Sequence, residues 1–92
     1  MAYGHPTHIS AVGDYVVKTG QGRLDRVCIN TKGTGPNFLT LLDGVDVSGP
    51  TLAVIDCANA SDSAIVYDLQ VARGVFARYT GGFPGDLTIV TD

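Results

Sequence analysis

The chain has 92 residues and a formal net charge of −3, and all nine of its acidic residues are aspartate. It contains 12 Gly but only two Lys and two Gln, whereas Val, Ile and Thr together number 25, a balance that favours an all-β domain over a helix bundle. The length fits one domain, the acidic balance excludes a basic nucleic-acid footprint, and no apolar stretch approaches the roughly 20 residues that span a bilayer.

The first 13 residues contain no Asp, Glu, Lys or Arg, and they carry two His and a Pro between Gly residues. No sustained periodicity is visible there, so we expect residues 1–13 to form an N-terminal arm outside the compact fold, with a short strand near residues 8–12. The start has neither a basic nor an apolar region of the kind found in signal peptides. This predicts synthesis in a cytoplasm and reduced thiols at Cys28 and Cys57.

Short β-type segments separated by turn residues follow from residue 14 to the end of the chain. Clusters of Gly, Pro, Asp and Asn mark each boundary. The expected strands are residues 15–19, 23–30, 37–42, 51–57, 63–71, 75–80 and 86–91.

The spacing of these segments predicts the fold class. About seven short strands at roughly ten-residue spacing are typical of an antiparallel β-sandwich or jelly roll, and the connections are too short for parallel crossovers. We therefore expect one β-sandwich domain over residues 14–92. Segment 37–42 is apolar on both faces, so it is either central in a sheet or covered by another chain. A domain of this size has a thin core, which favours added stability from neighbouring subunits.

Candidate chemical sites are few. Cys28 and Cys57 belong to no CxxC motif, which favours buried free thiols over a disulfide or a metal site. His5 and His8 would need a third ligand to hold a metal, so partner contacts are the preferred interpretation. The Asp43–Asp46 segment lacks the spacing of a calcium loop and fits hairpin chemistry. We predict no catalytic, metal-binding or cofactor-binding residues, and no enzyme activity, because no Ser or Cys is placed beside a His and an acid.

The residues predicted to contact a partner lie in the arm, in two strands and in the last loop. Arg is enriched at protein interfaces, although ordinary solvation explains an exposed Arg equally well. An aromatic ring between Gly and Pro in the last loop either contacts a partner or folds over its own sandwich end. The predicted interface residues are Tyr3, His5, Pro6, His8, Arg26, Arg78, Phe83 and Pro84.

Three segments carry a resemblance to a known group of proteins. They are VVKTGQGRLDRVCINT at residues 16–31, FLTLLDG at 38–44 and LAVID at 52–56. Together they resemble the small β-sandwich virion proteins of tailed bacteriophages, over about residues 15–91. Leu42 stands where an aromatic residue often precedes Asp-Gly in that group, and residues 73–85 are irregular, so the specific role stays open.

The resemblance implies a non-enzymatic structural protein of the phage particle. The expected role is a capsid decoration (cement) protein on the capsid exterior, assembled in the host cytoplasm. Its partners would be the major capsid protein and copies of itself, as a dimer or trimer at a capsid symmetry axis, with neither nucleic acid nor membrane involved. A head-fibre base or minor tail component is an alternative. From a different class, a carbohydrate- or surface-binding module would use exposed aromatic side chains.

Overall fold

The computed structural model describes residues 5–60 and 63–92 of the chain. Within these ranges lie eight β-strands and one short 3-10 turn, η1. No helix in the described ranges has the length and apolar character needed to cross a membrane. The strands are β1 (His5–Ile9), β2 (Gly13–Thr19), β3 (Gly22–Thr31), β4 (Asn37–Leu42), β5 (Thr51–Asp56), β6 (Ala64–Val71), β7 (Gly74–Gly81) and β8 (Asp86–Thr91), and η1 is Cys57–Asn59.

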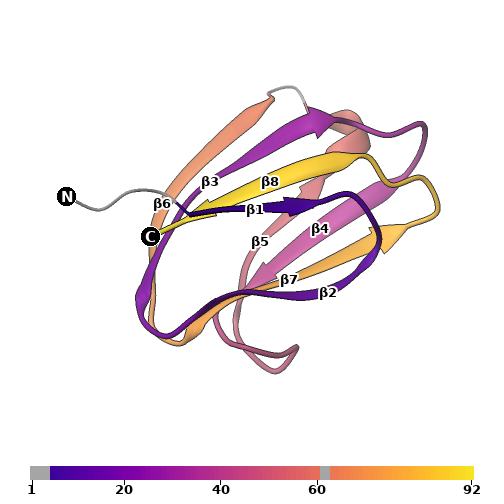
Figure 1. Ribbon diagram of the computed structural model, residues 1–92. Helices are drawn as coiled ribbons and strands as arrows, with labels where there is room; N and C mark the ends of the chain where they lie inside the picture. The colour runs from indigo at the N-terminus through magenta and orange to yellow at the C-terminus, as the bar shows by residue number, and fades with distance from the viewer. Residues whose placement is uncertain (1–4, 61–62) are drawn as a thin grey trace.

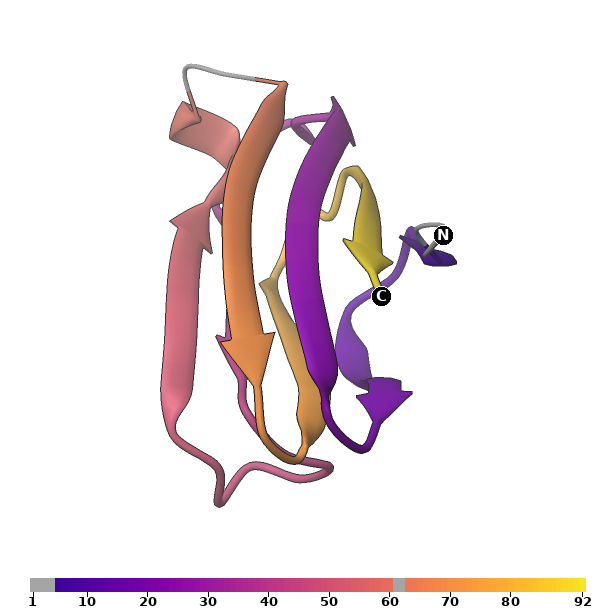
Figure 2. The same cartoon turned by 90° about the vertical axis from the view of Figure 1, so that its left-hand side faces the viewer.

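The strands form two antiparallel four-stranded sheets packed face to face (Figures 1 and 2). Sheet A has the order β1-β8-β3-β6, and sheet B has the order β2-β7-β4-β5. Strand β1 pairs with β8, β2 with β7, β3 with β6 and β4 with β5. The chain is thus a long antiparallel ribbon folded over on itself, which is the jelly-roll arrangement of two sheets. The predicted all-β sandwich is confirmed.

The N-terminal segment differs from the predicted arm. Residues 5–9 form β1, an edge strand of sheet A, and Ile9 is buried opposite Leu87 of β8. Strand β2 then begins at Gly13. The sandwich therefore has eight strands and includes residues that the sequence places outside the compact fold. The reason is that β1 buries only Ile9, so the alternation expected of a half-buried strand is too weak to recognise.

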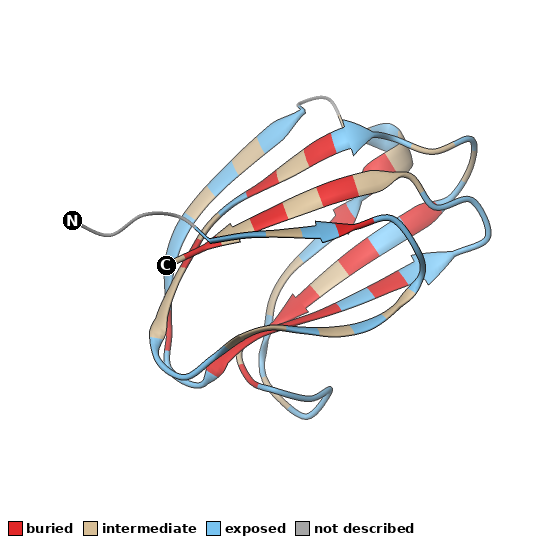
Figure 3. Cartoon of the chain, viewed as in Figure 1, coloured by how far each residue is buried: buried red, intermediate tan, exposed pale blue. Residues whose placement is uncertain are grey.

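The core consists of alternate residues along each strand, whose side chains point into the space between the sheets. Figure 3 shows this alternation of buried and exposed residues along the strands. Strand β4 shows the pattern clearly: Leu39 and Leu41 are fully buried, while Phe38 on the opposite face is 40% exposed. Strand β4 lies between β7 and β5, so it is central in sheet B, one of the two placements expected for a strand that is apolar on both faces. The largest buried side chains are Tyr79, Ile9, Leu24, Leu39, Leu41, Leu87 and Ile89.

A buried polar network closes one end of the sandwich. The Tyr79 hydroxyl donates to Oδ1 of Asn37 at 2.7 Å and accepts a bond from the backbone NH of Gly85, also at 2.7 Å. The Asn37 amide donates to the carbonyls of Lys32 and Gly35 at 2.8 and 2.9 Å. Burial raises the pKa of the Tyr79 hydroxyl, which keeps it a donor. One side chain from each of two central strands thereby fixes the loops 32–36 and 82–85, which we call the tip.

The first prediction concerns this network. Replacing Tyr79 with Phe keeps the ring but leaves Oδ1 of Asn37 and the NH of Gly85 without their partner. We expect the free energy of unfolding to fall by about 1–3 kcal/mol, the cost of unpaired buried polar groups. Urea unfolding of Tyr79→Phe and of Tyr67→Phe, a half-buried ring outside the network, provides the measurement and its control. Equal losses in the two variants would show that the network adds nothing specific.

Candidate functional site

Phe83 is the most exposed Phe or Tyr side chain of the described residues, and it lies at the tip. Half of it is accessible to solvent. Its other side lies against Gly35, where an added Cβ would come within 2.6 Å of the ring. At Gly33 an added Cβ would come within 2.3 Å of the Phe83 carbonyl oxygen. One side of the ring therefore packs on the molecule's own end, as one of the two sequence-based alternatives expects, and the other side faces outward with exposed Pro84.

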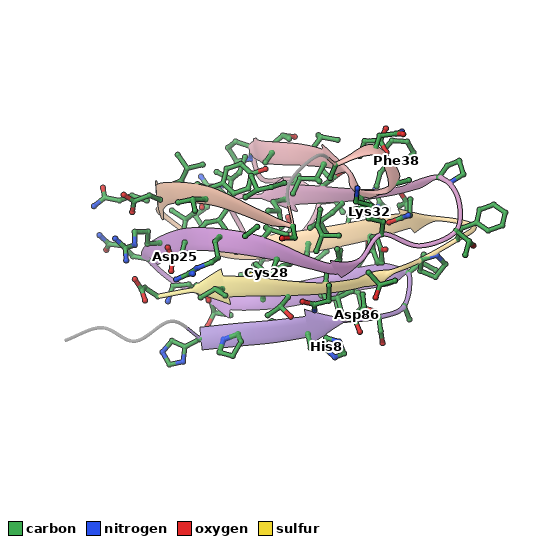
Figure 4. All side chains as sticks on the ribbon, turned by 90° about the horizontal axis from the view of Figure 1, so that it is seen from above. His8, Asp25, Cys28, Lys32, Phe38 and Asp86 are labelled. Atoms are coloured by element: carbon green, nitrogen blue, oxygen red, sulfur yellow. The ribbon has the colours of Figure 1, made fainter. Side chains whose placement is uncertain are left out.

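A polar cluster lies beside the tip on the outer face of sheet A. Nε2 of His8 contacts Oδ1 of Asp86, and the two side chains lie together in Figure 4. The Asn30 amide donates to the same carboxylate at 3.1 Å and to the Thr88 hydroxyl at 3.0 Å. The bond from Asn30 lowers the pKa of Asp86, and His8 adds to the effect. The cluster joins three neighbouring strands of sheet A, because His8 belongs to β1, Asp86 and Thr88 to β8, and Asn30 to β3.

The predicted interface residues divide between two faces. Pro6 and Arg26 face outward from sheet A in one cross-strand row, in which Pro6 lies opposite Val90 and Val90 lies opposite Arg26. Arg78 faces outward from sheet B, where it bonds Asp14 at 3.2 Å. Arg26 and Arg78 therefore face outward from opposite sheets, so one flat partner cannot cover both.

The other predicted interface residues of the N-terminal segment lie in different places. His8 lies on the outer face of sheet A, like Pro6, and contacts Asp86, the residue that follows the tip. His5 is exposed at the start of β1, opposite Thr91. Tyr3 lies outside the described residues. Because β1 belongs to the sandwich, deleting the N-terminal segment would remove Ile9 from the core, so point substitutions are the proper test of this region.

The two cysteines are free and lie in different environments. Cys57 is fully buried, and burial raises the pKa of its thiol, as expected of a thiol that acts as a small apolar group. Cys28 is only half-buried on the outer face of sheet A, because its neighbours Val27 and Ile29 face inward. The prediction of a buried Cys28 is therefore wrong.

The Asp43–Asp46 segment serves loop geometry. The carboxylate of Asp43 accepts backbone NH bonds from Ala72 and Arg73 at 3.0 and 2.9 Å, which lower its pKa. Asp46 accepts from the backbone NH of Ser48 at 2.9 Å, and its contacts with Ser48 lower its pKa. Hairpin chemistry is thus confirmed, and Asp43 additionally ties the β4–β5 loop to the β6–β7 turn. Nothing in the sequence indicates that long-range link.

A depression of about 500 Å³ lies at the end opposite the tip, and its lining includes Arg23, Asp43 and Asp92. Arg23 at its wall bonds Asp68 at 2.9 Å and also bonds Asp92, which raises the pKa of the guanidinium. The carboxylate of Asp43 in the same wall is held by the NH groups of its neighbouring turn. The terminal nitrogens of Arg23 and the carboxylate of Asp43 are thus bound by neighbouring groups, whereas Nε of Arg23 is buried without a hydrogen-bond partner.

Within residues 5–60 and 63–92, no three His, Cys, Asp or Glu side chains gather as metal ligands would. The comparison with protein-family models finds no match for this chain, and no curated protein matches it. The features that remain as a contact site are the half-exposed ring at the tip and the polar cluster beside it.

The second prediction concerns acid. Asp43, Asp46 and Asp86 all have a pKa below the ordinary aspartate value of 3.8 in the folded protein. Their contribution to stability is therefore present above that value and is lost as the pH falls through the lower folded pKa. We expect urea unfolding to show stability declining from about pH 5 downward. Asp43→Asn should flatten this decline relative to the native protein, and an unchanged slope in the variant would contradict the role of Asp43.

Proposed function

We propose that this protein is a non-enzymatic structural component of a bacteriophage virion, most specifically a capsid decoration (cement) protein. The proposal draws its biological setting from the resemblance of residues 15–91 to small β-sandwich virion proteins. Jelly rolls occur in viral capsid domains and in lectins, so the fold is compatible with both this role and the carbohydrate-binding alternative.

The observation that carries the proposal is the mounting of Phe83. A protein contact needs an apolar anchor that is exposed yet already ordered, because ordering a side chain on binding costs free energy. Gly35 beneath the ring and the Asn37–Tyr79 bond behind the loop supply that order before any partner arrives. His8 and Asp86 add polar groups where β8 begins, directly after the loop that carries the ring. This combination supports docking on a protein surface such as a capsid shell.

Self-association and many weak contacts suit such a role. A small domain has little surface to give to each contact, and a closed shell presents the same site many times. A modest interface per copy is then sufficient. The outer face of sheet A, with Pro6, His8 and Arg26 close to one another, extends the contact area next to the tip.

The third prediction tests this function with purified particles that lack the protein. Added protein should sediment with the particles, and quantitative mass spectrometry should count hundreds of copies per particle. Only a handful of copies would indicate a fibre base or tail component instead. An absence of binding to particles, together with binding on a glycan array, would favour the carbohydrate-binding alternative.

The fourth prediction tests the anchor. Phe83→Ser should weaken binding to particles by about tenfold or more, which corresponds to roughly 1.4 kcal/mol, while the unfolding free energy changes little. Val16→Ser is the matched control, because Val16 is 53% exposed on sheet B, away from the tip. Equal binding by both variants would exclude Phe83 as an anchor.

A further inference from the structure

Two edge strands, β5 of sheet B and β6 of sheet A, form one side of the sandwich (Figure 2). A shallow groove of about 370 Å³ runs between them. Half-buried Ile65 and Tyr67 reach this groove from β6, and Val54 and Ile55 reach it from β5. An edge strand presents backbone NH and CO groups without a partner on its outward side, so the natural occupant of such an edge is another extended strand.

The other three edges carry features that hinder strand addition. Strand β1 contains Pro6, which has no NH to donate. Strand β2 changes register between Val16 and Lys18 and carries that Lys. Strand β6 contains Asp68 at a φ of 52°, which interrupts its extended backbone. Bulges, Pro and Lys are the usual protection of exposed edges.

Strand β5 carries neither Pro nor Lys. Its residues 51–55 are uncharged, and its register shift against β4 falls at Leu52, so residues 53–56 pair with β4 in regular register. Val54, a β-branched side chain in the middle of the strand, is 63% exposed. A flat, apolar and uncharged edge of this kind pairs readily with a further strand.

We propose that β5 pairs with β5 of a second copy of this chain, antiparallel and around a two-fold axis perpendicular to the sheet. The two B sheets then form one continuous sheet across the dimer. A second copy is the occupant because the strand is complementary to itself in register and in charge, as a two-fold interface requires.

The register follows from the alternation of side chains. Opposite residues of an antiparallel pair point to the same face, so on a two-fold axis one residue must face itself. With Ala53 on the axis, exposed Val54 lies opposite Leu52 of the other copy, an apolar side chain that also packs against its own core at the register shift of β5. With Val54 on the axis, Leu52 would instead oppose the carboxylate of Asp56. The Ala53 register is therefore preferred.

Charge supports the same register. The two Asp56 carboxylates lie about 20 Å apart, six residues along the strands, so they do not repel strongly. Each Asp56 comes opposite Pro50 of the other copy. Arg73 lies at that end of the molecule, because Asp43 donates its NH to the Pro50 carbonyl and accepts the NH of Arg73. Within the described residues Arg73 makes no ion pair of its own, so it is available to Asp56 of the other copy.

This dimer rests on the proposed function only in the expectation that copies associate. Its test uses the purified protein without particles, so the dimer can fail while capsid binding stands, and capsid binding can fail while the dimer stands.

The test compares Val54→Lys with Val16→Lys by sedimentation equilibrium over a range of concentrations. Both valines are exposed on the outer face of sheet B, one on each of its edges, so the substitutions are matched in chemistry and in setting. We expect the native protein and Val16→Lys to reach twice the mass of one chain. Val54→Lys should raise the dimer dissociation constant by at least about tenfold, because two ammonium groups meet near the axis.

Amide hydrogen exchange identifies the contact itself. Amides of β5 should become protected as the native protein is concentrated, and they should stay unprotected in Val54→Lys, with circular dichroism verifying that both variants are folded. A monomer at all concentrations would overturn the proposal. A dimer whose β5 amides remain unprotected, or one that Val16→Lys disrupts and Val54→Lys does not, would overturn it as well.

Discussion

The bond from Tyr79 to Asn37 is the constraint on which the exposed end of this molecule depends. Neither group can be buried at low cost without a partner, and each satisfies the other while also holding a loop. The strands β4 and β7 that carry them are the central pair of sheet B. The central strands thereby hold both loops of the tip, through the bonds of Asn37 to Lys32 and Gly35 and of Tyr79 to Gly85. Phe83 packs against Gly35 on one side while half of it faces solvent.

The jelly-roll wrap adds a second constraint, because the first strand pairs with the last. Pairings such as β1 with β8 and β2 with β7 join residues far apart in sequence, so the sandwich cannot close until most of the chain is present. His8 and Asp86 lie at this closure. The slab is 17 Å across its thinnest dimension, which leaves one layer of core between the sheets. Substitution of Ile9 would therefore weaken both the core and the placement of His8, one of the residues proposed for partner contact.

The sequence allows most of the sandwich to be predicted, because period-two alternation survives wherever one face is buried. The predicted strands 37–42 and 86–91 are confirmed to the residue, and Leu87 and Ile89 do face inward. Strand β1 is missed because it contributes a single buried side chain. Strand β6 bulges at Asp68, which has a positive φ and lies where the register of β6 against β3 shifts. Such a bulge is set by pairing with β3, and local sequence does not encode it.

The candidate contact residues illustrate the same limit. The position of Phe83 in the last loop and of Arg78 in a strand follow from turn and strand patterns alone. That Arg26 and Arg78 lie on opposite faces depends on which sheet each strand joins, and sheet membership is decided by tertiary pairing. The same holds for the open edge at β5. The segment 51–56 has the same apolar character whether it is central or at an edge, so only the three-dimensional order of strands identifies it as an unprotected edge.

The two contact regions are compatible in one assembly. Strand β5 runs toward the tip, since Asp56 lies opposite Phe38, the neighbour of Asn37. Antiparallel pairing at β5 therefore directs the tips of the two copies away from each other and leaves both Phe83 rings uncovered. A dimer of this form would contact a shell at its two ends and bridge neighbouring subunits across a two-fold axis. Bridging of that kind reinforces a shell, because separating the subunits would require breaking a contact at one end of each dimer.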